Sequence, residues 1–92
     1  MYLKFSKHAE EQMVRRSLER SIVESVLLKP EQVVMDENDE DIAIYQSIVE
    51  DGDILFLYRV FVNTKVQPNV IVTLYKTTKI DKYYENQVQQ RR

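Results

Sequence analysis

Hydrophobic residues recur at helical spacing in the first part of the chain and at alternating positions after Pro30. Ser6 is a favourable N-cap, and Ala9 follows it on the apolar side of a helix that we predict over 7–16. A second helix is predicted between Glu19, as its cap, and Pro30, because proline pushes the preceding residue out of the helical region. The apolar face of this second helix consists of Ile22, Val23, Val26 and Leu27.

The alternation beyond Pro30 predicts strands rather than further helices. We place four strands near 32–36, 42–50, 54–63 and 70–76. Asp51-Gly52 is a typical tight-hairpin dipeptide, and the other connections are short and polar. The sequence therefore predicts an antiparallel meander of four strands.

Alternation also predicts which side chains share a face of this sheet. In the third strand the even positions are all apolar or aromatic, whereas the odd positions include Arg59. We expect the even positions to face the helices, together with Ile42, Ile44, Ile48, Val70, Val72 and Leu74, and with Gln46 as a polar exception. The opposite face would then carry Arg59, Tyr45, Ser47, Ile71, Thr73 and Tyr75.

The fold class is therefore α+β, with two N-terminal helices packed on a four-stranded antiparallel meander sheet. Residues 77–86 could add a short C-terminal helix, with Ile80 and Tyr84 as its docking pair. We expect one domain over residues 1–86 and a flexible tail over 87–92. Sequence alone leaves the oligomeric state open.

Composition excludes several kinds of chemistry. The chain has 92 residues, one histidine and no cysteine, which predicts a single small domain without disulfides or thiol catalysis. The longest apolar stretches are far shorter than the roughly 20 residues of a membrane helix, and no signal-peptide pattern opens the chain. We expect a cytoplasmic protein without a membrane segment, and no motif predicts a cofactor.

The charges are unevenly distributed along the chain. Residues 31–53 contain nine acidic side chains and no Lys or Arg, whereas residues 54–92 carry seven bases and two acids. The acidic block begins like a calcium loop, but Asp41 replaces its glycine and Ser47 its final glutamate. We therefore expect no metal site there, and a solvated turn that could attract a basic partner.

The opening Phe5-Ser6-Lys7-His8-Ala9 and the closing segment from Thr73 to Ile80, followed by Lys82-Tyr83-Tyr84, resemble a known group. It is the small bacterial domain of unknown function allied to the RelE/ParE toxin superfamily. His8, Ala9, Met13 and Arg16 match its opening pattern, while Gln12 stands where a basic residue is usual and Ser17-Leu18 where Gly-Ile is usual. The resemblance implies a RelE-like ribonuclease fold and cleavage of RNA without metal.

Such cleavage needs a proton acceptor, a proton donor and cations for the phosphoryl oxygens. The candidate catalytic residues are His8, Arg16 and Arg59, with His8 as the acid/base. The candidate nucleic-acid-binding residues are Arg15, Thr73, Tyr75, Lys76, Lys79 and Tyr83. Each also has a structural explanation: His8 could be solvated, and Arg59 could form an ion pair with one of the central acids.

Two functions follow from these residues. The first is a RelE-like domain that binds single-stranded RNA and could cleave it, as a toxin with an antitoxin-like partner. The second is a non-catalytic interaction module of the same fold that binds a protein or a nucleic acid. Gln12 favours the second, because it removes one usual cation from the site.

Overall fold

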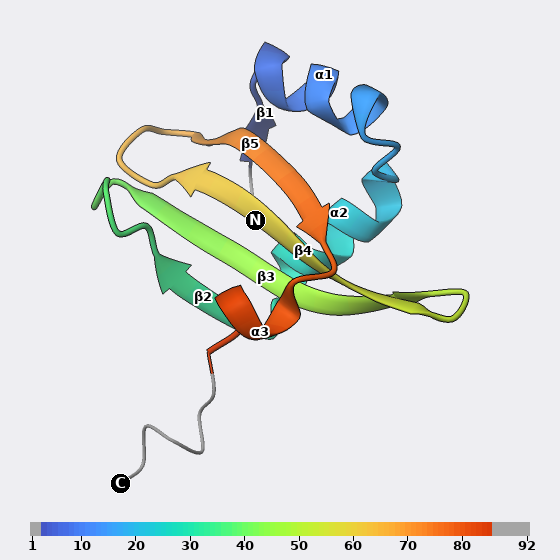
Figure 1. Ribbon diagram of the computed structural model, residues 1–92. Helices are drawn as coiled ribbons and strands as arrows, with labels where there is room; N and C mark the ends of the chain where they lie inside the picture. Colours follow the sequence, from blue (N-terminus) through green and yellow to red (C-terminus); the bar gives the residue numbers. More distant parts are fainter. Residues whose placement is uncertain (1–2, 86–92) are drawn as a thin grey trace, which may run out of the picture.

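A computed structural model of the chain describes residues 3–85, which form an α+β fold (Figure 1). The elements in chain order are β1 (Leu3–Phe5), α1 (Lys7–Arg15), α2 (Arg20–Leu28), β2 (Gln32–Met35), β3 (Ile42–Asp51), β4 (Ile54–Asn63), β5 (Asn69–Thr77) and α3 (Ile80–Tyr83). The five strands form one sheet in the order β1-β5-β4-β3-β2. The two predicted N-terminal helices and the four predicted strands are confirmed within one or two residues.

The predicted antiparallel meander is confirmed for β2, β3, β4 and β5, but the sheet has a fifth strand that was not predicted. β1 pairs in parallel with β5, from Leu3 opposite Asn69 to Phe5 opposite Ile71, and makes the sheet mixed. The sequence does not reveal β1, because three residues are too few to show an alternating pattern. Its position brings the start of the chain against the last strand.

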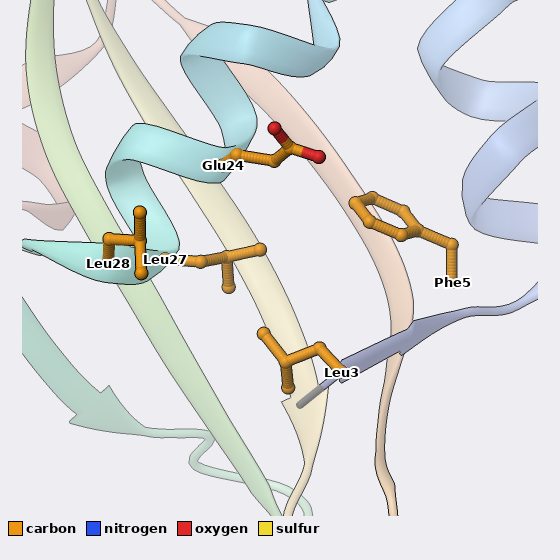
Figure 2. A pocket seen from close by; sticks show the side chains of 5 residues that line it. All are labelled: Leu3, Phe5, Glu24, Leu27 and Leu28. Atoms are coloured by element: carbon orange, nitrogen blue, oxygen red, sulfur yellow. The ribbon is translucent and has the colours of Figure 1, made fainter. Parts of the chain in front are cut away.

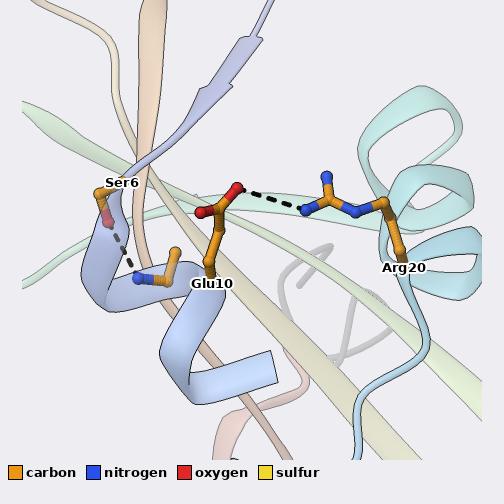
Figure 3. A network of polar contacts seen from close by, with 4 residues as sticks. Ser6, Glu10 and Arg20 are labelled. Atoms are coloured by element: carbon orange, nitrogen blue, oxygen red, sulfur yellow. Dashed lines mark hydrogen bonds and ion pairs between the residues drawn. The ribbon is translucent and has the colours of Figure 1, made fainter. Parts of the chain in front are cut away.

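The start of α1 is tied both to its own first turn and to the sheet. Ser6 Oγ accepts a hydrogen bond from the backbone N–H of Ala9 at 3.0 Å and donates one to the carbonyl oxygen of Val72 at 3.2 Å. Figure 3 shows this cap beside an ion pair of 3.5 Å between Glu10 on α1 and Arg20 on α2. Both partners of the ion pair are about half exposed, so it contributes less than about 1 kcal/mol.

The end of α1 is a Schellman motif centred on Ser17. The N–H of Leu18 donates to the carbonyl of Met13, and the N–H of Ser17 donates to that of Val14. Ser17 has φ of 55°, a left-handed conformation that glycine adopts more easily than serine. The motif turns the chain toward α2 and carries Leu18 into the core.

Helices α1 and α2 cover one face of the sheet, which we call the α1/α2 face (Figure 1). Their buried side chains pack with those of β4 and β5 in one hydrophobic cluster, made of Ala9, Met13, Leu18, Val23, Val26, Leu27, Tyr58, Val60, Val62, Ile71 and Leu74. The even positions of β4 thus face these helices, as the alternation predicted.

The predicted orientation of β3 was wrong. Tyr45 lies opposite Val60 and Ser47 opposite Tyr58, which places these two β3 residues on the α1/α2 face. Ile42, Ile44, Gln46 and Ile48 therefore point to the other side, as Arg59 does. β3 is apolar on both sides, so hydrophobicity alone does not decide its orientation. The two-residue turn after Asp51 decides it.

A β-bulge also changes the predicted assignment in β5. The register shifts between Phe61, opposite Thr73, and Val62, opposite Ile71, so that Val72 is the extra residue. Ile71 consequently enters the core and is fully buried, contrary to the prediction that it faces away from the helices. Thr73 and the residues after it keep the predicted side.

The opposite side of the sheet carries α3, and we call it the α3 face. The backbone carbonyl of Tyr83 accepts a hydrogen bond from Gln46 Nε2 at 3.2 Å. Gln32 exchanges two hydrogen bonds with the backbone of Glu85, at 2.7 and 3.1 Å. These bonds hold α3 and the residues after it against β2 and β3. The helix itself spans Ile80–Tyr83 and is shorter than predicted.

Residue 86 and the predicted tail 87–92 lie outside the described residues. In the part of the chain from residue 3 to residue 85, no helix has the length and apolar character needed to cross a membrane.

Candidate functional site

Arg59 is the most unusual polar residue of the fold. It lies in the middle of β4 and points to the α3 face, where only 8% of its surface is exposed. Its Nε donates a hydrogen bond to Gln46 Oε1 at 2.9 Å, and its Nη1 donates one to the hydroxyl oxygen of Tyr75 at 2.8 Å. Both acceptors are neutral, so these bonds fix the guanidinium without cancelling its charge.

Three aromatic rings surround this guanidinium. Its Cζ atom lies 4.3 Å from the ring centroid of Tyr83, 5.5 Å from that of Phe61 and 5.9 Å from that of Tyr75. The rings of Tyr75 and Tyr83 meet edge to face at 6.3 Å. Cation–π attraction of this kind stabilises a cation that water reaches poorly. Arg59, Gln46, Phe61, Tyr75 and Tyr83 are called the Arg59 cluster below.

No carboxylate of residues 3–85 forms an ion pair with Arg59, since the ion pair found there joins Arg20 and Glu10. The predicted alternative, in which a central acid neutralises Arg59, was therefore wrong for this part of the chain. A buried charge is costly to desolvate and is normally paired. The hydrogen-bond partners of Arg59 are instead neutral, and aromatic rings surround its guanidinium.

The guanidinium borders a hollow of about 360 Å³ on the α3 face. Apolar and aromatic side chains line part of it, among them Ile44, Phe61 and Tyr83. Polar groups line the rest: the cations of Arg59 and Lys82, the acidic turn after β2 with Asp36, Glu37 and Asn38, and Glu85 after α3. The hollow thus combines a fixed cation, aromatic rings and carboxylates.

Tyr83 has an altered acidity. Burial alone would raise the pKa of its phenol, but hydrogen bonds to Lys82 and Tyr75 and the positive charges of Lys82 and Arg59 outweigh this effect. The pKa of Tyr83 therefore lies below its ordinary value of 10.0. Ionisation of Tyr83 would place a negative charge directly beside Arg59.

The predicted residues of α1 do not lie in this cluster. His8, Arg15 and Arg16 are exposed on α1, which packs on the α1/α2 face of the sheet. Arg16 Nε donates a hydrogen bond of 2.6 Å to the side chain of the buried Gln12. Histidine and Arg59 are therefore on opposite sides of the sheet.

The predicted residues of the C-terminal third are divided between the two faces. Tyr75 and Tyr83 surround Arg59, and Thr73 lies on the same face, opposite Phe61. Lys76 is on the α1/α2 face, with its Nζ 4.6 Å from the ring centroid of Phe56. Lys79 is exposed just before α3.

Sequence reasoning missed the contributions of Gln46, Phe61 and Lys82. The sequence does contain a signal for Gln46, because it interrupts an apolar strand. A buried side-chain amide needs hydrogen-bond partners, so a polar neighbour was to be expected. The acidic turn was interpreted as a solvated loop, although Asp36 and Glu37 line the hollow.

A second hollow, of about 240 Å³, lies between β1 and α2 (Figure 2). It is lined by Leu3, Phe5, Leu27 and Leu28 and by the carboxylate-bearing Glu24. Within residues 3–85, no group of three or more His, Asp or Glu side chains is arranged to hold a metal ion. The Arg59 cluster is therefore the better candidate site.

The sequence model of a family described as a domain of unknown function, DUF4258, matches residues 5–76. The chain belongs to this family. In this DUF4258 domain the match contains Arg59 and Tyr75, whereas Lys82 and Tyr83 follow it. No curated protein and no solved structure matches the chain. The resemblance to the RelE/ParE toxins stays a prediction.

Proposed function

We propose that this DUF4258 domain is a RelE-like RNA-binding module that holds single-stranded RNA on its α3 face, at the Arg59 cluster. The observation that carries the proposal is a buried arginine that has neutral partners and an intact charge. Such a group stabilises an anion that enters the hollow, because the attraction is stronger where water is scarce.

The guanidinium can donate further hydrogen bonds to a bound RNA in a fixed orientation. Arginine has five N–H donors, and Gln46 and Tyr75 accept from two of them. The other three have no acceptor among residues 3–85. Phosphate oxygens and the acceptor pair at one edge of a base both match the planar fork of arginine, and hydrogen bonds from a charged donor are about twice as strong as neutral ones.

The aromatic rings provide the second part of an RNA site. Phe61, Tyr75 and Tyr83 are half-buried, so part of each ring is accessible. Bases of single-stranded RNA stack on such rings, at roughly 1–3 kcal/mol per base. The exposed Lys82, whose Nζ lies 5.3 Å from the ring centroid of Tyr83, adds positive charge beside the cluster.

The geometry favours binding over cleavage. The predicted acid/base, His8, lies on α1 and on the other side of the sheet from Arg59. An acid/base must lie within hydrogen-bond reach of the proton that it moves. The nucleotide held at Arg59 would therefore lie out of hydrogen-bond reach of His8, and the second predicted function, a non-catalytic module, agrees better with this arrangement.

Binding of a basic protein partner is a second candidate function. The edge strand β2 exposes Val33 (51%) and Met35 (57%) beside the acidic turn that follows it. An exposed edge strand can pair with an extended segment of another chain. An antitoxin-like protein with a basic, extended segment would match this edge.

Fluorescence anisotropy with a labelled, mixed-sequence single-stranded RNA tests RNA binding. We expect wild-type affinity to fall steeply with salt, and Arg59→Gln to weaken it about tenfold or more. His8→Ala and Lys76→Ala are matched controls outside the α3 face, and we expect each to stay within about twofold of wild type. Circular dichroism verifies that every variant is folded.

Absence of salt-dependent binding by the wild type would refute the proposal. So would equal binding by wild type and a folded Arg59→Gln variant. Incubation of RNA with wild type and His8→Ala in a chelator then tests cleavage. We expect intact RNA in both, and cleavage that His8→Ala abolishes would restore the catalytic alternative.

A further inference from the structure

The acidic side chains of the hollow need an explanation. Asp36, Glu37 and Glu85 line the same hollow as Arg59, although carboxylates repel a phosphate backbone. A ligand that contacts both ends of this hollow must therefore present acceptors to the guanidinium and donors to a carboxylate.

Asp36 is the carboxylate best placed for such a contact. It follows β2 at a position that alternation assigns to the α3 face, two residues after Val34, which also lines the hollow. Asp36 is half-buried, whereas Glu37 and Glu85, the other carboxylates of the hollow, are exposed. Its Oδ1 accepts the backbone N–H of Asn38 at 3.1 Å, which orients the carboxylate and leaves further acceptor sites.

The register of the strands places Arg59 and Asp36 at separate points of the hollow. Arg59 lies opposite Gln46, and Gln46 lies opposite Gln32, four residues before Asp36. Strand spacing of ~4.8 Å and a rise of ~3.3 Å per residue place the two Cα atoms about 16 Å apart. Both side chains stand on the same face and line the same hollow, so a ligand that lies in it can contact the guanidinium and the carboxylate together.

We propose that this hollow binds a guanine base of single-stranded RNA. Arg59 donates to O6 and N7 of the base, and the Asp36 carboxylate accepts from N1–H and the N2 amino group. Among the four RNA bases, guanine alone offers a pair of acceptors at one edge and a pair of donors at another. The base stacks on Phe61 and Tyr83, whose rings line the hollow.

This inference rests on the proposed RNA binding and adds its base specificity. It also accounts for the neutral partners of Arg59. Gln46 and Tyr75 hold the guanidinium in one orientation and leave its charge available, whereas a carboxylate at either position would compete with the base.

Ten-nucleotide oligouridines with one central G, A or C, and the unsubstituted oligouridine, test the inference by fluorescence anisotropy. We expect the G-containing RNA to bind about tenfold more tightly than the others, since each bidentate base contact discriminates by ~1–3 kcal/mol. Inosine at the central position lacks the N2 amino group, and 7-deazaguanine lacks N7. We expect each to lose most of the preference.

Asp36→Asn tests the contribution of the Asp36 carboxylate without changing the other residues of the site. The asparagine still accepts the Asn38 N–H, so we expect the variant to fold. It should bind G-containing RNA and oligouridine within about threefold of each other, and inosine should no longer weaken its binding. Glu40→Gln removes the same charge from the same exposed turn, outside the hollow, and should keep the preference.

The two proposals fail in different ways. If the wild type binds none of the four RNAs, the proposed function is wrong. If the wild type binds all four RNAs with equal affinity and Arg59→Gln weakens binding of all four equally, RNA binding is supported and the guanine inference is wrong. A preference for guanine that survives in Asp36→Asn would also overturn the assignment of Asp36.

Discussion

Gln46 is the residue on which the position of Arg59 depends most directly. It is fully buried, accepts from Arg59 Nε, and donates to Gln32 Oε1 at 2.8 Å and to the carbonyl of Tyr83 at 3.2 Å. Gln46→Leu keeps the approximate size of the side chain and removes all three bonds. The bond to the charged guanidinium contributes about 1.5–3 kcal/mol and each neutral bond about 0.5–1.5 kcal/mol. We expect a loss of about 3–5 kcal/mol in the free energy of unfolding.

Urea denaturation followed by circular dichroism measures this loss. Gln12→Leu is the matched control: Gln12 is similarly buried, but it receives one side-chain bond, from the exposed Arg16 that water can solvate again. We expect it to cost less than about 1.5 kcal/mol.

A double variant tests the cause of the loss. Replacing both members of a buried polar pair by apolar groups is less costly than leaving one of them unpaired. Gln46→Leu combined with Arg59→Met should therefore be more stable than Gln46→Leu alone. Two results would contradict this explanation. One is a loss of unfolding free energy in Gln46→Leu no larger than that in Gln12→Leu. The other is a double variant whose loss equals the sum of the losses in Gln46→Leu and Arg59→Met.

Three further predictions concern the helix ends and the phenol. Ser17→Gly should stabilise the domain by about 0.5–1 kcal/mol in urea denaturation, since glycine adopts the positive φ without strain, and a loss of stability would contradict this. Ser6→Ala should lower the free energy of unfolding by about 1–2 kcal/mol, because the N–H of Ala9 loses its hydrogen-bond acceptor. An unchanged midpoint of urea denaturation would show that water replaces the hydroxyl. RNA affinity should fall as the pH rises through the lowered pKa of Tyr83, because the phenolate opposes the charge of Arg59. Tyr83→Phe should lack this loss, and the same pH profile in both proteins would exclude Tyr83 as its cause.

The helices and most strands could be predicted because local signals specify them. The Ser6 cap, the apolar periodicity and Pro30 define α1 and α2, and the alternation of β4 gives the correct face for Arg59. Thr73 and Tyr75 were placed correctly beside it, because the β-bulge lies on the other side of Thr73 and leaves their register unchanged.

The errors have physical causes that local patterns do not show. β3 is apolar on both sides, so its orientation follows from the hairpin: the two-residue turn pairs each even residue of β3 with an odd residue of β4. Applying this parity would have placed Gln46 beside Arg59. The separation of His8 from Arg59 is different, since it depends on which side of the sheet the first helix takes, a long-range property.

The contact between β1 and β5 joins segments that are 66 residues apart. During synthesis, β1 and α1 emerge first but lack their pairing strand until the chain has been extended through residue 77. At 5–20 residues per second, this interval lasts several seconds. During that time no completed sheet covers the apolar side of α1. The domain therefore folds only when β5 pairs with β1 at the end, and not one element after another along the chain.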